Sequence, residues 1–109
     1  MELAFADRSL RQLCEDSAKA DRHFGVKVAE KLRRRLADIR AVACVKDLVA
    51  GRPRELKDGR FAVEVFGGVR IVFCANHNSN PQLKSGVVDW SKVGRVKILT
   101  IESNHDNEQ

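Results

Sequence analysis

The clearest pattern of apolar and polar positions along the chain lies between residues 26 and 43. Apolar side chains recur there at spacings of three and four residues, which places them on one face of a helix: Ala29, Leu32, Leu36, Ile39 and Ala43. We therefore expect an amphipathic helix over residues 26–43. An earlier helix is expected to begin after Asp7 or Ser9, because either side chain can cap a first turn, and to continue through LRQLCEDSAKA.

Short apolar or alternating runs predict four strands: residues 3–6, 61–66, 70–75 and 95–103. The order of elements is one strand, two helices and three strands. This order predicts an α+β fold, β-α-α-β-β-β, in which two N-terminal helices pack on one face of a mostly antiparallel sheet.

The length of the chain limits its organisation. A chain of 109 residues has room for one core, so we expect a single domain over residues 1–109. Residues 76–94 contain Asn, Pro and Gly at intervals and predict a long loop, which Trp90 pins to the domain. Residues 104–109 predict a short acidic tail.

The segment FAVEVFGGVRIVF allows two registers for a hairpin. A two-residue turn would pair Phe66 with Val69 and mix apolar and charged side chains on both faces. A three-residue loop pairs Phe66 with Arg70, and we prefer it because it yields one uniformly apolar face: Phe61, Val63, Val65, Ile71, Phe73 and Ala75. The opposite face, left free to form a shallow concave site, then carries three charged side chains: Arg60, Glu64 and Arg70.

Positive charge is concentrated in one part of the chain. The net charge is +5, and residues 19–60 hold thirteen basic and six acidic side chains. This asymmetry favours a polyanionic partner or an acidic protein partner. The arginines at 33–35 also have a simpler interpretation as the solvated outer face of the 26–43 helix.

Several function classes lack their sequence signatures. The chain has no Gly-rich phosphate loop, no Cys-x-x-Cys, no HExxH and no GxSxG. Three histidines lie too far apart to predict a metal site, so we expect no metal and no cofactor: His23, His77 and His105.

Cysteine usage and hydropathy predict a cytoplasmic protein. The three cysteines are widely spaced and odd in number, which favours reduced thiols: Cys14, Cys44 and Cys74. The sequence has no run of 18 apolar residues and no signal pattern at its N-terminus, so we expect no membrane partner.

The remaining candidate chemistry is a cationic cluster with a histidine at the end of the last strand: Arg54, Lys57, Arg60 and Arg70, with His105. Fixed cations stabilise the charge that a scissile phosphate gains in its transition state. Histidine can serve as acid or base near neutral pH, so the cluster suits metal-free cleavage of RNA. The alternative is structural: Arg60 and Arg70 form a bridged trio with Glu64.

Four segments resemble the RelE/ParE toxin superfamily, and most closely its HigB-type branch of plasmid-maintenance killer proteins: VAEKLRRRLADIRA, LKDGRFAVEV, GVRIVF and VDWSKV. The resemblance spans nearly the whole chain. It implies a RelE-like fold and a ribosome-dependent endoribonuclease that cuts mRNA, an mRNA interferase. It also implies a partner, a HigA-like helix-turn-helix antitoxin.

The resemblance implies roles for individual residues. Lys57 stands where the family keeps a functional lysine, and Arg70 matches the phosphate-contacting arginine of the R-I-x-F strand. His105 matches the histidine of a carboxy-terminal Asp-Tyr-His pattern, and Arg54 falls where some HigB-type members carry a histidine. Lys57, Arg70 and His105 are thus the expected catalytic residues. The expected RNA contacts are Arg60 and Arg54, together with helix cations that would touch ribosomal RNA, Arg34 among them.

One departure from the family pattern concerns this chemistry. The Asp-Tyr-His pattern becomes Ser103-Asn104-His105, and the chain contains no tyrosine. Two alternatives therefore stay open beside the nuclease. One is a non-catalytic binding protein of the same fold, and the other is a ParE-like inhibitor of DNA gyrase.

Overall fold

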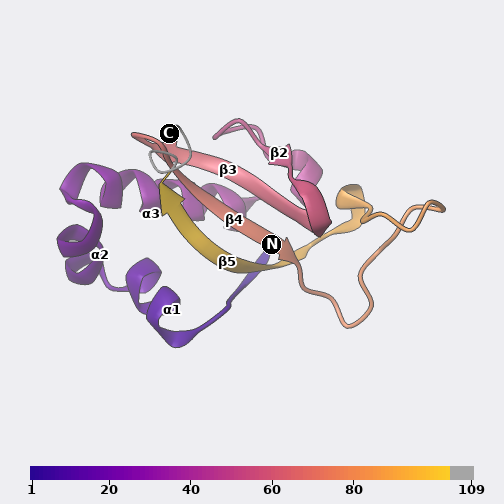
Figure 1. Cartoon of the computed structure of the whole chain (residues 1–109), viewed down its shortest axis with the longest axis horizontal. Helices are drawn as coiled ribbons and strands as arrows, with labels where there is room; N and C mark the ends of the chain where they lie inside the picture. Colours follow the sequence, from indigo (N-terminus) through magenta and orange to yellow (C-terminus); the bar gives the residue numbers. More distant parts are fainter. Residues whose placement is uncertain (104–109) are drawn as a thin grey trace.

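The structure is a computed structural model that describes residues 1–103. Its α-helices, strands and 3-10 turns follow in this order (Figure 1): β1 (Glu2–Phe5), α1 (Arg8–Glu15), α2 (Ser17–Phe24), α3 (Val26–Ala41), η1 (Val45–Asp47), β2 (Arg54–Glu55), η2 (Lys57–Gly59), β3 (Arg60–Phe66), β4 (Val69–Ala75), η3 (Trp90–Lys92) and β5 (Arg95–Ser103).

The strands form one mixed sheet in the order β1-β5-β4-β3-β2. β1 pairs with β5 in parallel, and the other neighbouring strands are antiparallel. Helix α3 runs behind the sheet in Figure 1, while the opposite face is turned toward the viewer. The predicted α+β fold with helices on one face of a mostly antiparallel sheet is therefore confirmed.

The first predicted helix is divided in two. Asp7 begins α1, and its side chain accepts a hydrogen bond from the Leu10 amide at 2.8 Å. Asp16 has extended backbone angles, and its side chain accepts from the Lys19 amide at 3.2 Å to begin α2. The prediction of two N-terminal helices was wrong, because Asp16 is a cap that ends one helix and begins the next. Three helices precede the hairpin.

The core lies between α3 and the inner face of the sheet. α3 contributes its apolar stripe, although the helix ends at Ala41, so only four of the five predicted positions are buried within it: Ala29, Leu32, Leu36 and Ile39. Four sheet residues opposite them have no exposed surface: Val63, Ile71, Phe73 and Ile98. Burying each such large side chain contributes about 1.5–3 kcal/mol, so this layer holds the sheet on α3.

The register of the β3–β4 hairpin differs from the preferred prediction. Phe66 pairs with Val69 across a two-residue turn, and a bulge then leaves Val65 without a partner, so that Glu64 lies opposite Arg70. The predicted pairing of Phe66 with Arg70 was wrong. The predicted core face is nevertheless confirmed, because the bulge restores the alternation, and all six of its side chains are buried: Phe61, Val63, Val65, Ile71, Phe73 and Ala75.

The 76–94 loop is tied to the domain at several points. Trp90 is 2% exposed, and its ring lies 5.0 Å from that of Phe61, measured between centroids. The ring of His77 accepts a hydrogen bond at Nε2 from the Gly94 amide, at 3.2 Å. The Ser91 amide and hydroxyl donate to Asp89, which lowers the pKa of that carboxyl. Trp90 thus pins the loop as predicted.

Candidate functional site

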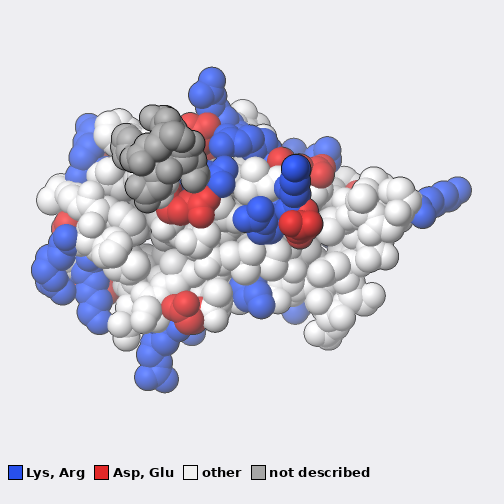
Figure 2. Space-filling view, viewed as in Figure 1, with Lys and Arg blue, Asp and Glu red and all other residues white. Residues whose placement is uncertain are grey.

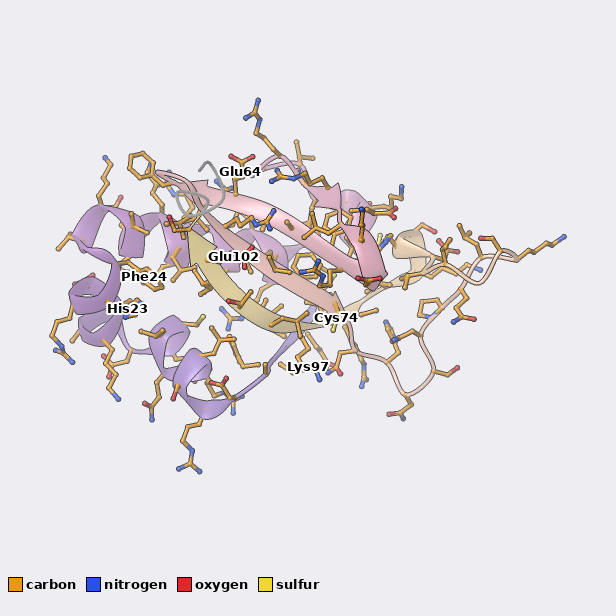
Figure 3. All side chains as sticks on the ribbon, viewed as in Figure 1. His23, Phe24, Glu64, Cys74, Lys97 and Glu102 are labelled. Atoms are coloured by element: carbon orange, nitrogen blue, oxygen red, sulfur yellow. The ribbon has the colours of Figure 1, made fainter. Side chains whose placement is uncertain are left out.

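The face of the sheet turned away from α3 carries the candidate site. We call it the open face and define it by alternation and register from these residues: Arg54, Arg60, Ala62, Glu64, Arg70, Val72, Cys74, Lys97, Thr100 and Glu102. Figure 2 shows basic side chains beside acidic ones over the middle of this face. Figure 3 shows Glu64 and Glu102 toward one end of the open face and Cys74 and Lys97 toward the other.

The end near the β3–β4 turn is neutralised by ion pairs. Arg70 donates from Nε and Nη2 to one oxygen of Glu102, at 2.7 and 2.6 Å. Arg54 binds Glu64 at 3.0 Å, and Arg52 lies 3.9 Å from the same carboxylate. The side chain of Arg70 is only 16% exposed. Arg70 and Arg54 are therefore held in place, and each shares its charge with a carboxylate.

The other end of the open face keeps its positive charge. Arg60 donates from Nε to the backbone carbonyl of Lys57 at 3.3 Å, which orients the guanidinium. Within residues 1–103, no carboxylate lies within ion-pair distance of Arg60, Lys57 or Lys97. An anionic ligand can therefore bind these cations without first displacing a carboxylate of residues 1–103.

The two arginines predicted to act together lie apart on the open face. Arg60 is opposite Cys74 and Arg70 is opposite Glu64, so the two positions are four steps apart along β4. At a rise of about 3.3 Å per residue this is about 13 Å along the strand. The bridged trio of Arg60, Glu64 and Arg70 was wrong, because Glu64 binds Arg54 and Arg70 binds Glu102.

The remaining predicted residues are placed as follows. Lys57 in η2 lies beside Arg60, whereas Arg54 in β2 lies opposite Ala62 and binds Glu64. Arg34 is exposed on α3, which packs on the inner face, so the structure does not bring it to the open face. His105 lies outside the described residues.

Comparisons with known proteins place this architecture. No family model matches the chain, and a search of curated proteins finds no match. Among solved structures, the "YoeB/ParE toxin from Agrobacterium tumefaciens" is 12% identical, with a TM-score of 0.57 over 94% of this chain and 98% of that one. The "YoeB-YefM complex from Staphylococcus aureus" is 17% identical, with a TM-score of 0.54 over 94% of each chain. The chain has the RelE/ParE toxin fold. Its assignment to the HigB-type branch stays a prediction.

Two residues of the open face in this toxin fold were missed from the sequence: Lys97 and Glu102. They are five positions apart in β5, an odd spacing that in a regular strand puts side chains on opposite faces. A register shift leaves Leu99 without a partner and restores both residues to the open face, where Lys97 lies opposite Cys74 and Glu102 opposite Arg70. The sequence carried no signal for this bulge.

The described part of the toxin fold shows neither a cluster of metal ligands nor an activated Cys14 thiol. Within residues 1–103, no group of three His, Cys, Asp or Glu side chains is placed to hold a metal ion. Burial raises the pKa of the Cys14 thiol to about 11, so Cys14 is a poor nucleophile near neutral pH. No helix in the same range is long and apolar enough to cross a membrane.

Proposed function

We propose that the chain is the toxin of a toxin–antitoxin module and that it cleaves mRNA on the ribosome. The observation that carries this proposal is a set of cations without a carboxylate partner in residues 1–103, on the open face of a RelE/ParE toxin fold. Arg60 among them is oriented by the carbonyl of Lys57 at 3.3 Å. Such cations bind phosphate through charge-assisted hydrogen bonds. The net charge of +5 supports a polyanionic substrate.

The cleavage step needs no metal. The 2′-hydroxyl of the RNA attacks the adjacent phosphorus, the bond to the 5′-oxygen breaks, and the products are a 2′,3′-cyclic phosphate and a 5′-hydroxyl. Lys57, Arg60 and Arg54 bind the strand, and Arg70 stabilises the charge on the phosphate. His105 acts as the acid or base that moves the proton.

Arg70 reaches this role from a paired state. In the free protein its guanidinium binds Glu102 through Nε and Nη2, at 2.7 and 2.6 Å, and this contact fixes its direction. A phosphate that reaches Arg70 either replaces Glu102 or binds the remaining N–H groups. The carboxylate therefore reduces the affinity of Arg70 for phosphate while it holds the side chain in place.

The proposed partner is a HigA-like helix-turn-helix antitoxin encoded beside this chain. The similar structure from Staphylococcus aureus is a complex of YoeB with YefM, which supports an antitoxin partner for this fold, and the HigA-like type is our proposal. The ribosome and mRNA are the other partners, the location is the cytoplasm, and plasmid maintenance is the biological setting.

Expression in bacterial cells without the antitoxin tests the proposal. We expect wild-type protein to arrest growth and to leave mRNA cut within coding regions, as mapped by primer extension. Arg70→Ala is expected to relieve both effects. Arg95→Ala, which removes an exposed arginine paired with Glu2, is the matched control and is expected to leave both effects unchanged. Growth arrest with intact mRNA would contradict the nuclease.

A second candidate is a non-catalytic binding protein of the same fold. It is favoured by the carboxylate partners of Arg70 and Arg54 and by the absence of tyrosine from all 109 residues. It predicts normal growth and intact mRNA in the same experiment. A ParE-like gyrase inhibitor would instead arrest growth and block DNA supercoiling by purified gyrase.

A further inference from the structure

Arg60, Cys74 and Lys97 form one row across three adjacent strands of the open face. Arg60 in β3 lies opposite Cys74 in β4, which in turn lies opposite Lys97 in β5. Neighbouring strands are about 4.8 Å apart, so the two cationic residues are separated by about 10 Å at the backbone. Their long side chains can both reach a group seated over Cys74.

The cations of this row differ from their neighbours on the same face in having no carboxylate partner within the described residues. On the same face of β5, Arg95 binds Glu2 at 3.0 Å, and toward the turn Arg70 binds Glu102. Neither Arg60 nor Lys97 has such a carboxylate within the described residues. Within residues 1–103, the cations of the open face without a carboxylate partner therefore lie in this row and at Lys57 beside it.

Apolar side chains lie between this row and the Arg70 end of the open face. Ala62 and Val72 are opposite each other in the next row, and both are buried, at 0% and 1% exposure. These side chains are short, and neither can bind a phosphate. Positive charge on the open face therefore lies at two positions, one at Arg70 and one at Arg60 and Lys97. The two positions are about 13 Å apart along β4.

We propose that Arg60 and Lys97 form a second phosphate-binding subsite, which holds a single-stranded RNA by a phosphate distant from the one that Arg70 contacts. The guanidinium supplies a planar fork of donors, and the ammonium supplies a point charge. This inference rests on the proposed function and deepens it, because it adds Lys97 and a direction for the RNA across the open face.

Cys74 reports directly on occupancy of this subsite. All three cysteines are free, and Cys74 is the one on the open face. Cys44 lies in the turn that follows α3, and Cys14 reacts slowly because burial raises its pKa to about 11. Alkylation of wild-type protein by iodoacetamide, read for each cysteine by peptide mass spectrometry, therefore measures the subsite with Cys44 as the internal reference.

The first experiment measures this alkylation with and without an unstructured RNA oligonucleotide. RNA at about ten times its Kd leaves about one protein in eleven free, so alkylation of Cys74 is expected to slow about tenfold. The rate at Cys44 is expected not to change. Equal rates at Cys74 with and without bound RNA would overturn the subsite. Protection by a poly-glutamate peptide and not by RNA would also overturn it, and would identify an acidic peptide as the ligand.

The second experiment measures RNA affinity by fluorescence anisotropy at several salt concentrations. Arg60→Gln and Lys97→Gln are each expected to reduce the dependence of log Kd on log salt by about 0.7, the value of one phosphate contact in a single strand. Arg95→Gln is the matched control, because Arg95 also projects from β5 but is paired with Glu2, and it is expected to leave the slope unchanged.

The outcomes separate this proposal from the proposed function. Unchanged slopes for both variants, in a protein that cleaves mRNA on the ribosome, would remove the subsite and leave the nuclease intact. Absence of RNA binding by wild-type protein at low salt would overturn the subsite too, and cleavage on ribosomes would then decide the nuclease independently.

Discussion

The pair between Arg70 and Glu102 makes a quantitative prediction about stability. Both Nε and Nη2 of Arg70 bind one oxygen of Glu102, and the two side chains are 16% and 34% exposed. Solvent-exposed ion pairs contribute about 0.2–1 kcal/mol, and removing one partner of a fully buried pair costs about 3–5 kcal/mol. This pair is between those limits, so we expect Glu102→Gln to lower the free energy of unfolding by about 1–2 kcal/mol.

The matched control is the pair of Arg95 and Glu2, which has a similar distance of 3.0 Å but side chains that are 60% and 71% exposed. Glu2→Gln is expected to cost no more than about 0.5 kcal/mol. Urea denaturation of both variants supplies the comparison. A double-mutant cycle with Arg70→Met isolates the coupling, expected at about 1 kcal/mol or more.

Glu102→Gln is expected to affect cleavage and stability in opposite directions. Glu102→Gln removes a negative charge beside Arg70, so cleavage of mRNA is expected to persist or increase while stability falls. Arg70→Gln is expected to lower cleavage. A coupling energy near zero would refute the conclusion that Glu102 holds Arg70. Loss of cleavage in a folded Glu102→Gln variant would refute the conclusion that Glu102 competes with phosphate.

Three further predictions concern the scaffold. Gly51→Ala is expected to lower the free energy of unfolding, measured by urea denaturation, by more than about 2 kcal/mol. Gly51 has φ +86°, and a Cβ there would lie 2.7 Å from the Glu64 carbonyl oxygen. Gly67→Ala, where a Cβ would meet nothing within 4 Å, should lower it less. Trp90→Ala is expected to cost about 3–5 kcal/mol and to raise amide exchange in residues 76–94, and unchanged exchange there would contradict the anchoring role. The Cys14 thiol has its pKa raised from 9.0 to about 11, so the unfolded chain loses this proton first; stability should fall as pH rises from about 9 to 11, and Cys14→Ala should flatten that decline.

Local periodicity predicted the layers of the fold because each element buries one face. The stripe in α3 and the alternation in β3 and β4 identified the buried side chains. The packing of the sheet on α3 followed from these buried faces. The prediction of one continuous first helix failed for a local reason. Asp16 occurs within a run that is otherwise compatible with one helix, and its capping geometry becomes visible only in the structure.

The candidate site depended on register, which alternation alone does not determine. Two bulges, at Val65 and Leu99, set which charges meet across the strands. The first places Glu64 opposite Arg70 and Arg60 opposite Cys74, and the second brings Lys97 and Glu102 to the same open face. A bulge adds one residue without a distinctive sequence pattern here, so the sequence predicted the cations of the site but neither their carboxylate partners nor Lys97.

The central claim is that a cationic sheet face in this toxin fold cleaves mRNA, and one measurement tests it most directly. Purified protein is added to ribosomes translating a defined mRNA, and cleavage is followed by primer extension for the wild type and for Arg70→Ala combined with His105→Ala. We predict cuts within the coding sequence by the wild type and loss of these cuts in the double variant. Intact mRNA with the wild type, or equal cleavage by both proteins, would contradict the account.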